Sequence, residues 1–478
     1  MSARTAASAG PRALMLRREL GFLETAAVSV GVMAPTLAMS VTGIAAAQQL
    51  GRAAPLAFVV AGLGVGLVAF GFIRLAGEFS SAGSVYAFVG HALSARMGLV
   101  AGWALLGTYL VFPPVSIMGV AVFGQAFLRS AGIAEHADWY PLALGAWAVI
   151  WLLAARGIRP TTRSVLLVEV ISVVLITVLM AIIVVKLATG THTSTGASGF
   201  TASVFSLPPG VGVDILAVAA TSGFLAFAGF ESAGSLGEES LRPRRSIPRA
   251  IVTAVVFGAI FYVACMVTQS LGFGTDPAGV DAFRQSDAPL GDLARHFVGN
   301  PFATTLDAAA VLSAIGAGLG GVTVGARMMF AFARDGLGTR RVGEVAPRTN
   351  VPTRALLVEM VFGLVALTTF RLLGTAPLDV FFYLATIGVL NLLVMYIITN
   401  IAAVRHLARR SIWESALPIA GTAVAAFVLY HNVWPVPAPP YRYLPYVALS
   451  WLAIGVLLST IPGILAGVQR GLARRERG

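Results

Sequence analysis

The sequence predicts an all-helical membrane protein that crosses the bilayer twelve times. Of its 478 residues, 57% are hydrophobic and only 11% are charged, whereas a soluble protein of this length needs more charge on its surface. Long apolar runs recur from one end of the chain to the other, and each can cross the hydrocarbon core as a helix. Two of these runs carry a proline or glycine in the middle that is expected to interrupt the helix.

Twelve apolar stretches are the predicted spans, since a helix needs about 20 apolar residues to cross a bilayer. They lie at 24–48, 54–77, 98–128, 140–156, 162–187, 212–238, 249–273, 301–333, 353–373, 377–403, 413–431 and 443–467. The stretch 78–97 is too polar to span and is expected as a helical hairpin element at the interface. The segments 188–210 and 274–300 are expected as exposed loops, the second with a short helix.

Basic residues are distributed unevenly over the connecting segments. With the N-terminus inside, 25 of the 33 Lys and Arg residues fall on the inner side and seven on the outer side, with Arg327 left over in the eighth span. Such a bias marks the cytoplasmic side, so both termini are expected to be cytoplasmic in an inner or plasma membrane. The net charge of +12 therefore indicates membrane topology, with the bilayer as partner, and not contact with nucleic acid.

This arrangement predicts four segments along the chain. Residues 1–20 form a cytoplasmic N-terminal tail, 21–405 a transport core of helices 1–10, 406–468 helices 11 and 12, and 469–478 a cytoplasmic C-terminal tail. The single cysteine, Cys265, excludes an intrachain disulfide and a metal site built from cysteines. No His-Glu-x-x-His, P-loop or Gly-x-Ser-x-Gly motif occurs, so neither an enzyme nor a cofactor or metal is expected.

The two breakers lie in the first and sixth spans. The first span reads "GVMAPTLAMSVTG", with Pro35 in its middle, and the sixth reads "FLAFAGFE", with Gly229 two residues before Glu231. Helix breaks at membrane depth persist only where protein or a water-filled cavity satisfies the freed backbone groups. Breaks five spans apart predict two inverted repeats with the binding site at the breaks, and a carboxylate at membrane depth usually marks function.

Three stretches resemble the amino acid–polyamine–organocation (APC) permeases. They read "FAGFESAGSLGEESLRPRRSIPRAI" (227–251), "ARMMFAFARDGLG" (326–338) and "EFSSAGSVYAFVGHALSARMGLVAGWALL" (78–106). The resemblance covers roughly residues 20–410. It implies a five-plus-five inverted repeat like that of the leucine transporter, with two extra C-terminal helices. It also implies alternating-access transport of amino acids, polyamines or related amines between broken helices 1 and 6.

The resemblance also implies positions for substrate. The family's Gly-Ser-Gly turn falls on Pro35-Thr36-Leu37 here, so two glycines are missing on the side that receives a carboxylate. Carbonyls between Phe224 and Phe227 are expected to face the ammonium group, and Leu225 stands where some members place an aromatic gate. The expected substrate-binding residues are Pro35, Thr36, Leu37, Ala38, Thr108, Tyr109, Phe224, Leu225, Phe227 and Gly229. Thr108 and Tyr109 are equally compatible with packing roles.

Coupling and gating have their own candidates. Many proton-coupled members carry a lysine in the fifth helix where this chain has Ser172, and Glu169 lies one turn earlier on about the same face. Glu169 either carries a proton or pairs with Arg163 or with the arginine of the eighth span. Glu231 either takes part in proton or gating chemistry or holds the broken helix through a fixed hydrogen bond. An inner gate is expected from ion pairs among Glu238, Glu239, Arg327, Arg334 and Asp335.

The expected function is that of a secondary active permease for an amino acid or related amine, coupled to protons or acting by exchange. A polyamine or other organic amine permease is one alternative. A channel or a non-transporting sensor on the same fold is another. The sequence leaves the substrate side chain, the coupling ion, the stoichiometry and the oligomeric state open.

Overall fold

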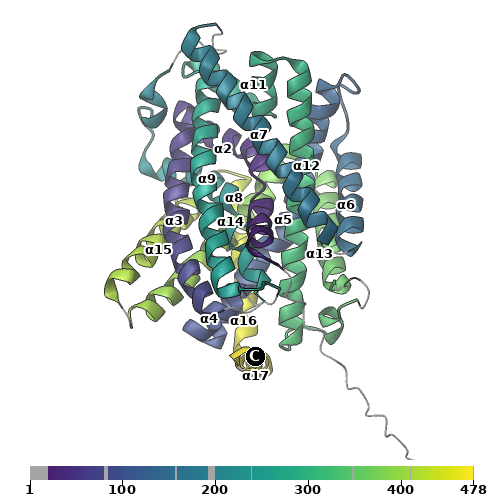
Figure 1. The fold of residues 1–478 in the computed structure, drawn as a ribbon, viewed down its shortest axis with the longest axis vertical. Helices are drawn as coiled ribbons and strands as arrows, with labels where there is room; N and C mark the ends of the chain where they lie inside the picture. Colours follow the sequence, from purple (N-terminus) through teal and green to yellow (C-terminus); the bar gives the residue numbers. More distant parts are fainter. Residues whose placement is uncertain are drawn as a thin grey trace, which may run out of the picture.

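The structure is a computed structural model that describes residues 20–79, 84–156, 159–191, 200–237, 239–346, 349, 351–409 and 411–476. These residues form α-helices and short 3-10 helices, and among them the one β-type contact is a bridge between Leu20 and Ser240. Most of the long helices run along the longest axis of the molecule as a bundle (Figure 1). The all-helical class predicted from composition is confirmed.

The first half of the chain builds a broken helix, four unbroken long helices and a short one. Its described elements are α1 (Phe22–Met33), α2 (Pro35–Leu50), η1 (Gly51–Ala53), α3 (Ala54–Glu78), α4 (Ser84–Ala92), α5 (Ala95–Ser130), α6 (Trp139–Arg156), α7 (Arg159–Thr189) and η2 (Ala202–Phe205).

The second half opens with another broken helix and ends with the helices that follow the tenth predicted span. Its described elements are α8 (Val213–Phe227), η3 (Phe230–Leu236), α9 (Pro243–Phe273), α10 (Pro277–Gln285), α11 (Pro289–Phe297), α12 (Asn300–Arg334), η4 (Arg340–Gly343), α13 (Thr353–Leu372), α14 (Pro377–Leu407), α15 (Ile412–Val433), η5 (Tyr441–Tyr443), α16 (Leu444–Thr460) and α17 (Pro462–Glu476).

Eleven stretches of the described residues are long and apolar enough to cross a membrane. The first of them, Phe22–Glu78, has 57 residues, which would measure about 86 Å as one straight helix. A bilayer core is about 30 Å thick, and this stretch turns at η1, where Gly51 has a φ of 57°. Counted as two crossings, α1–α2 and α3, it brings the total to the twelve spans predicted.

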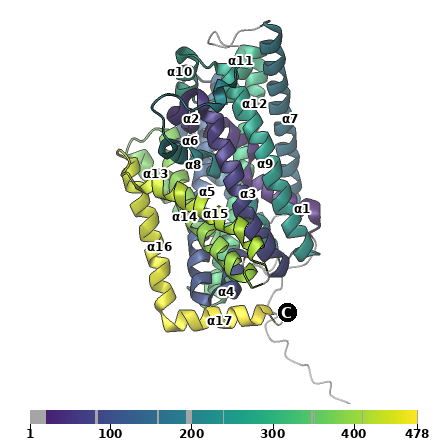
Figure 2. The same ribbon diagram turned by 90° about the vertical axis from the view of Figure 1, so that its left-hand side faces the viewer.

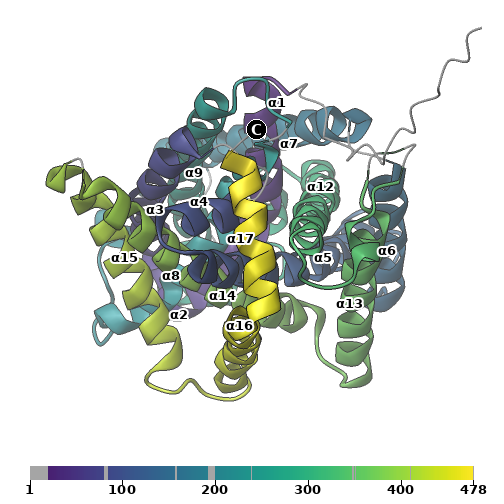
Figure 3. The same ribbon diagram turned by 90° about the horizontal axis from the view of Figure 1, so that it is seen from below.

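The last predicted span is wrong at its second end. It was expected at 443–467, but α16 ends at Thr460 and a separate helix, α17, begins at Pro462. Ile461 has an extended ψ of 116°, and the ring of Pro462 cannot continue the helix before it. α17 lies nearly at right angles to α16 (Figure 2) and crosses one end of the bundle (Figure 3).

Two connecting segments are more structured than expected. The stretch expected as an interfacial hairpin element contains one short helix, α4, whose residues Val85–Val89 are buried. α4 packs against α5 and α14, so it belongs to the protein interior. The loop expected to hold one short helix holds two, α10 and α11, at the end of the molecule opposite α17 (Figure 2).

The centre of the bundle is formed by α5 and α12, which are 36 and 35 residues long and pack against each other. They occupy the third position in each half when the spans are counted from the broken ones. Glycines on α12 allow close approach of neighbouring helices. A Cβ at Gly320 would lie 2.6 Å from Cγ2 of Val32, next to the break in the first span. The long helices therefore fix the position of that break.

Candidate functional site

The first break is a single residue between two helices. α1 ends at Met33 and α2 begins at Pro35, while Ala34 between them has φ 44° and ψ 66°, in the left-handed region. Proline suits the first position of a helix because its missing N–H would have no intrahelical partner there. The first span is interrupted where the sequence predicted.

The second break lies between α8 and η3. α8 ends at Phe227, Gly229 has a φ of 112°, and the chain continues as a 3-10 helix from Phe230. This positive φ favours glycine, because a Cβ is strained there. The sixth span is therefore also interrupted where the sequence predicted.

The two breaks touch each other. A Cβ on Gly229 would lie 2.6 Å from Cγ1 of Val32 and 2.9 Å from the backbone nitrogen of Met33, so only glycine fits. The hydroxyl of Ser29 donates a hydrogen bond of 3.1 Å to the carbonyl of Phe230. Segments some 200 residues apart in the sequence thus meet at their unwound points.

The first N–H groups of α2 have protein partners. The Thr36 N–H donates to Oε1 of Glu169 at 2.8 Å, and the Leu37 N–H donates to Oγ of Ser313 at 3.2 Å. Ser313 also forms a side-chain hydrogen bond with Glu169, and both side chains are buried. The Ala38 N–H is already used within the helix, by the Ala34 carbonyl at 2.9 Å. A buried carboxylate therefore lies at the positive end of α2.

Glu231 lies inside a cage of donors at the second break. Its Oε2 accepts the Gly229 N–H at 3.1 Å, and its Oε1 accepts the hydroxyl of Tyr109 at 3.0 Å. The hydroxyl of Tyr396 donates to Oε2 at 3.4 Å, and the carboxyl group is buried. This geometry ties the turn of the sixth span to α5 and α14.

The other predicted substrate positions divide between the hollow and the packed interior. Leu225 lines a hollow described below, whereas Phe224 packs against Gly64 and Phe227 against Gly62 and Gly258. Thr108 donates its hydroxyl to the Gly388 carbonyl at 3.0 Å, on the side of α14.

Of the coupling candidates on α7, one has a local partner and the predicted partner of the other lies outside the described residues. Ser172 donates its hydroxyl to the Val168 carbonyl at 2.7 Å, one turn back along α7. The proposed partner of Glu169, Arg163, has a side chain outside the described part of the structure. The alternative in which Glu169 pairs with Arg163 stays untested.

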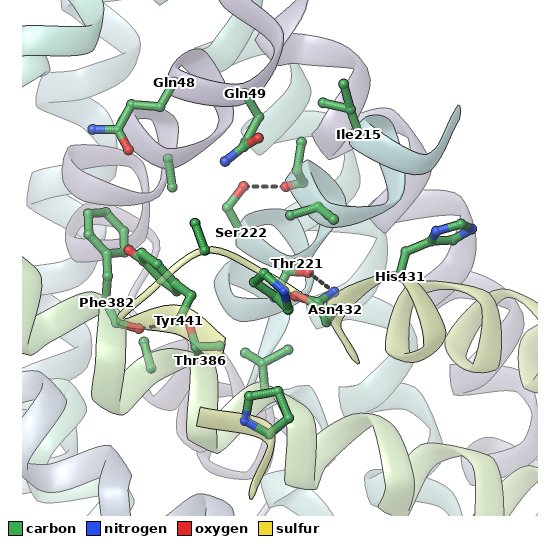
Figure 4. Close-up of a pocket in the computed structure, with 18 of the residues that line it drawn as sticks. Gln48, Gln49, Ile215, Thr221, Ser222, Phe382, Thr386, His431, Asn432 and Tyr441 are labelled. Atoms are coloured by element: carbon green, nitrogen blue, oxygen red, sulfur yellow. Dashed lines mark hydrogen bonds between the residues drawn. The ribbon is translucent and has the colours of Figure 1, made fainter. Parts of the chain in front are cut away.

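A hollow of about 450 Å³ lies between the ends of α2, α8, α14 and α15, at the end of the molecule away from α17. Its wall is partly polar, and the segment between α15 and α16 covers one side (Figure 4). Leu225 places it next to the last turn of α8, beside the second break. Its polar lining residues are Gln48, Gln49, Asp214, Thr221, Ser222, Thr386, His431, Asn432 and Tyr441.

The half of the molecule nearer α17 carries an ion pair where a gate was predicted. Nη2 of Arg327 lies 2.8 Å from Oε1 and 3.0 Å from Oε2 of Glu239. Asp335 accepts a hydrogen bond from the hydroxyl of Tyr86 at 2.8 Å. Nε of Arg334 lies 3.9 Å from Oδ1 of Asp335. Glu238 lies outside the described residues. The gating role of these groups stays a prediction.

Two partners in the site were missed by the sequence reasoning. Ser313 on α12 and Tyr396 on α14 complete the environments of the two buried carboxylates. Serine and tyrosine are unremarkable within membrane spans, so no signal in the sequence distinguishes them from packing residues.

Comparisons with known proteins point to one family. The family model described as amino acid permease matches residues 27–432, a range that includes both breaks. The chain is 25% identical to the low-affinity putrescine importer PlaP of Escherichia coli (strain K12), over 76% of this chain and 77% of that protein. It is 26% identical to the branched-chain amino acid permease BcaP of Bacillus subtilis (strain 168), over 82% and 81%. It is also 25% identical to the methylthioribose transporter of the same strain, over 94% of both chains.

Proposed function

Since the chain belongs to the amino acid permease family, and is therefore a membrane transporter, we propose that it carries a small amine or amino acid past its two broken helices by alternating access. The names of its relatives cover putrescine, branched-chain amino acids and methylthioribose. Our proposal takes from them the class of small organic amines and amino acids.

The contact between the two breaks is the observation that carries this proposal. Unwound backbone at membrane depth is tolerated where it borders a cavity or is buried in protein. Here the breaks meet beside a hollow at one end, while the Arg327–Glu239 pair holds α12 to the segment after η3 at the other. We take this arrangement as one of the two states of an alternating-access cycle.

We propose that the end bearing α17 faces the cytoplasm of a cell whose inner or plasma membrane holds the protein. Of the 33 Lys and Arg residues, 25 lie in segments assigned to that side, as expected of cytoplasmic loops. The hollow then opens to the outside, and the Arg327–Glu239 pair lies on the cytoplasmic side as an inner gate.

We propose protons as the coupling ion, with Glu169 or Glu231 as the acceptor. Both carboxyl groups are buried beside a break, and ionisable residues at such depth commonly serve proton transfer. The three donors around Glu231 support its second role, that of holding the turn. Uptake by Glu169→Gln and Glu231→Gln between pH 5 and 8 separates these roles. If one of the two carboxylates is the proton acceptor, its Gln variant is expected to lose the pH dependence of uptake while remaining folded. An unchanged pH profile of uptake in both variants would show that neither carboxylate takes part in coupling.

Counterflow in proteoliposomes tests the transport function itself. Vesicles loaded with an unlabelled amine or amino acid are expected to accumulate the labelled compound transiently, because a carrier exchanges substrate across the membrane. A thermal-shift screen of amines and amino acids selects the compound beforehand, since a ligand stabilises the folded state by mass action. Single-channel currents without substrate saturation would favour the channel alternative, and binding without flux would favour a sensor.

A further inference from the structure

The N-terminus of α2 has the features of a carboxylate-binding site. Pro35 begins the helix, and the N–H groups of Thr36 and Leu37 are free of intrahelical bonds. Free N–H groups and the positive end of the helix dipole together attract an anion. A substrate with a carboxylate would be expected to place it here, because this terminus adjoins the break.

The protein already supplies the anion. Oε1 of Glu169 accepts a hydrogen bond from the Thr36 N–H at 2.8 Å. Oγ of Ser313 accepts one from the Leu37 N–H at 3.2 Å, and the Ser313 side chain also forms a hydrogen bond with Glu169. Glu169 is 2% exposed, so it is enclosed by protein and not extended into solvent. Both donors that a substrate carboxylate would use are therefore taken.

The surroundings hold this arrangement in place. Leu37 packs closely on α5. A Cβ added at Gly119 of α5 would lie 2.7 Å from Cδ1 of Leu37.

Within the described residues, no hydrogen bond or ion pair joins Glu169 to a basic side chain. An ionised Glu169 would repel a second carboxylate at this point and attract an ammonium group. A carboxylate has about four lone-pair positions, so Glu169 keeps acceptor capacity beyond its contacts with Thr36 and Ser313.

We propose that Glu169 is a built-in replacement for a substrate carboxylate, and that the protein selects organic amines without an α-carboxylate over the corresponding amino acids. This inference rests on the proposed transport past the two breaks and narrows its substrate class. Glu169 acts as a specificity-determining residue, since it fills the anion site and presents a negative charge to the amine.

Matched pairs of ligands test the selectivity. Cadaverine and lysine differ by one carboxylate, and so do isoamylamine and leucine. Binding of each compound to the purified full-length protein is measured by thermal shift, and uptake is measured in proteoliposomes. At least one amine is expected to bind tenfold or more tightly than its amino acid. Amino acids that bind as tightly as their amines in both pairs would overturn this inference and leave the transport function standing. No saturable binding or uptake of any amine or amino acid in the wider screen would overturn the transport function itself.

Variants at position 169 test the cause. Glu169→Ala frees the Thr36 N–H and removes the negative charge, so the amine preference is expected to fall at least tenfold as amino acid binding improves. Glu169→Gln keeps an acceptor for that N–H and loses only the charge, and it gives a second reading if the alanine variant does not fold. Thr177→Val on the exposed side of α7 is the matched control, because its hydroxyl bonds only the Val173 carbonyl of its own helix. An unchanged preference in both Glu169 variants would overturn the proposal.

Discussion

At the scale of single residues, buried carboxyl groups in the spans differ sharply in their partners. Glu231 accepts hydrogen bonds from a backbone N–H and two tyrosine hydroxyls. Glu359 on α13 is fully buried beside Gly325 of α12, and both of its oxygens lack a hydrogen-bond partner among the described residues. A buried polar group without a partner costs free energy, whereas one with good partners contributes to stability. The two glutamates should therefore respond oppositely to mutation.

Glu231→Ala is expected to lower the unfolding free energy by about 3 kcal/mol, because it leaves the Gly229 N–H and two hydroxyl groups unpaired. Thermal unfolding of the purified protein in one detergent measures the effect. Tyr396→Phe is the control, since it removes only the longest of the three bonds, 3.4 Å, and should cost less than about 1 kcal/mol. Equal losses in the two variants would contradict a turn-holding role for Glu231.

Glu359→Gln is expected to leave the melting temperature unchanged or to raise it. The amide has almost the same shape, so it keeps one unpartnered polar group in place of another, but it cannot carry a charge and so removes the cost of burying an unpaired carboxylate. The same unfolding assay checks this. A loss as large as that of Glu231→Ala would show that Glu359 makes an interaction absent from this conformation.

Gly229→Ala is expected to destabilise the protein by more than about 2 kcal/mol, since it adds backbone strain and a clash in one step. The φ of 112° disfavours a Cβ, and that Cβ would lie 2.6 Å from Val32. Ala34→Gly is the matched change at the other break, where φ is 44°, and it should stay within about 1 kcal/mol of the parent. Similar effects at both breaks would argue against the contact between them.

The sequence indicates where these residues lie more readily than what they touch. The depth of Glu231 and the two breakers could be predicted from hydropathy and from proline and glycine. The partner of Glu169 could not, because Thr36 lies 133 positions away and its N–H leaves no trace in the side-chain pattern. From the sequence, Glu169 could either transfer protons or pair with an arginine. The structure adds a further partner, the N-terminus of α2.

At the scale of elements, α17 is the main addition to the sequence-based picture. Its Gly467 and Gly471 lie one turn apart and face Asp335 at the end of α12, where a Cβ on either would clash. Leu472 packs against Gly90 of α4. Small residues spaced by four allow such close approach, so α17 is docked on the bundle and its position depends on these two glycines.

Gly471→Leu is expected to detach α17 while preserving its helix, since leucine is the better helix former but overlaps the Asp335 carboxylate. Limited trypsin digestion at Arg470 measures the detachment, and cleavage should become several-fold faster. Gly463→Leu is the control, because a Cβ there would meet nothing within 4 Å. Equal cleavage of both variants would contradict the docking of α17.

The ends of the helices show why pattern reading succeeded in part. Apolar length predicted most spans within a few residues, since lipid demands an uninterrupted apolar helix of fixed length. The last predicted span extended past Pro462, because the residues on either side of this proline remain apolar although the chain turns there. Apolar length also missed the burial of α4, because a short helix with one apolar face looks the same under a membrane surface and under neighbouring helices.

At the scale of the whole molecule, a hollow lies at one end and an ion pair toward the other, as expected for one state of the proposed cycle. The hollow borders α2, α8 and α14, whereas the Arg327–Glu239 pair links α12 to the segment after η3. An inverted repeat stays a prediction from breaks five spans apart. The contact between the breaks could not be predicted, since it depends on how α5 and α12 bring the two halves together.

In the proposed cycle, the two ends of the molecule open in turn around the broken helices. Single cysteines at Thr386, in the hollow, and at Ser235, buried in η3, report on the two ends in a Cys265→Ser background. Labelling of the purified protein with a polar maleimide is compared with and without Arg327→Ala. We predict that loss of the ion pair raises labelling at position 235 and lowers it at position 386. Changes in the same direction, or none at either position, would contradict alternating access.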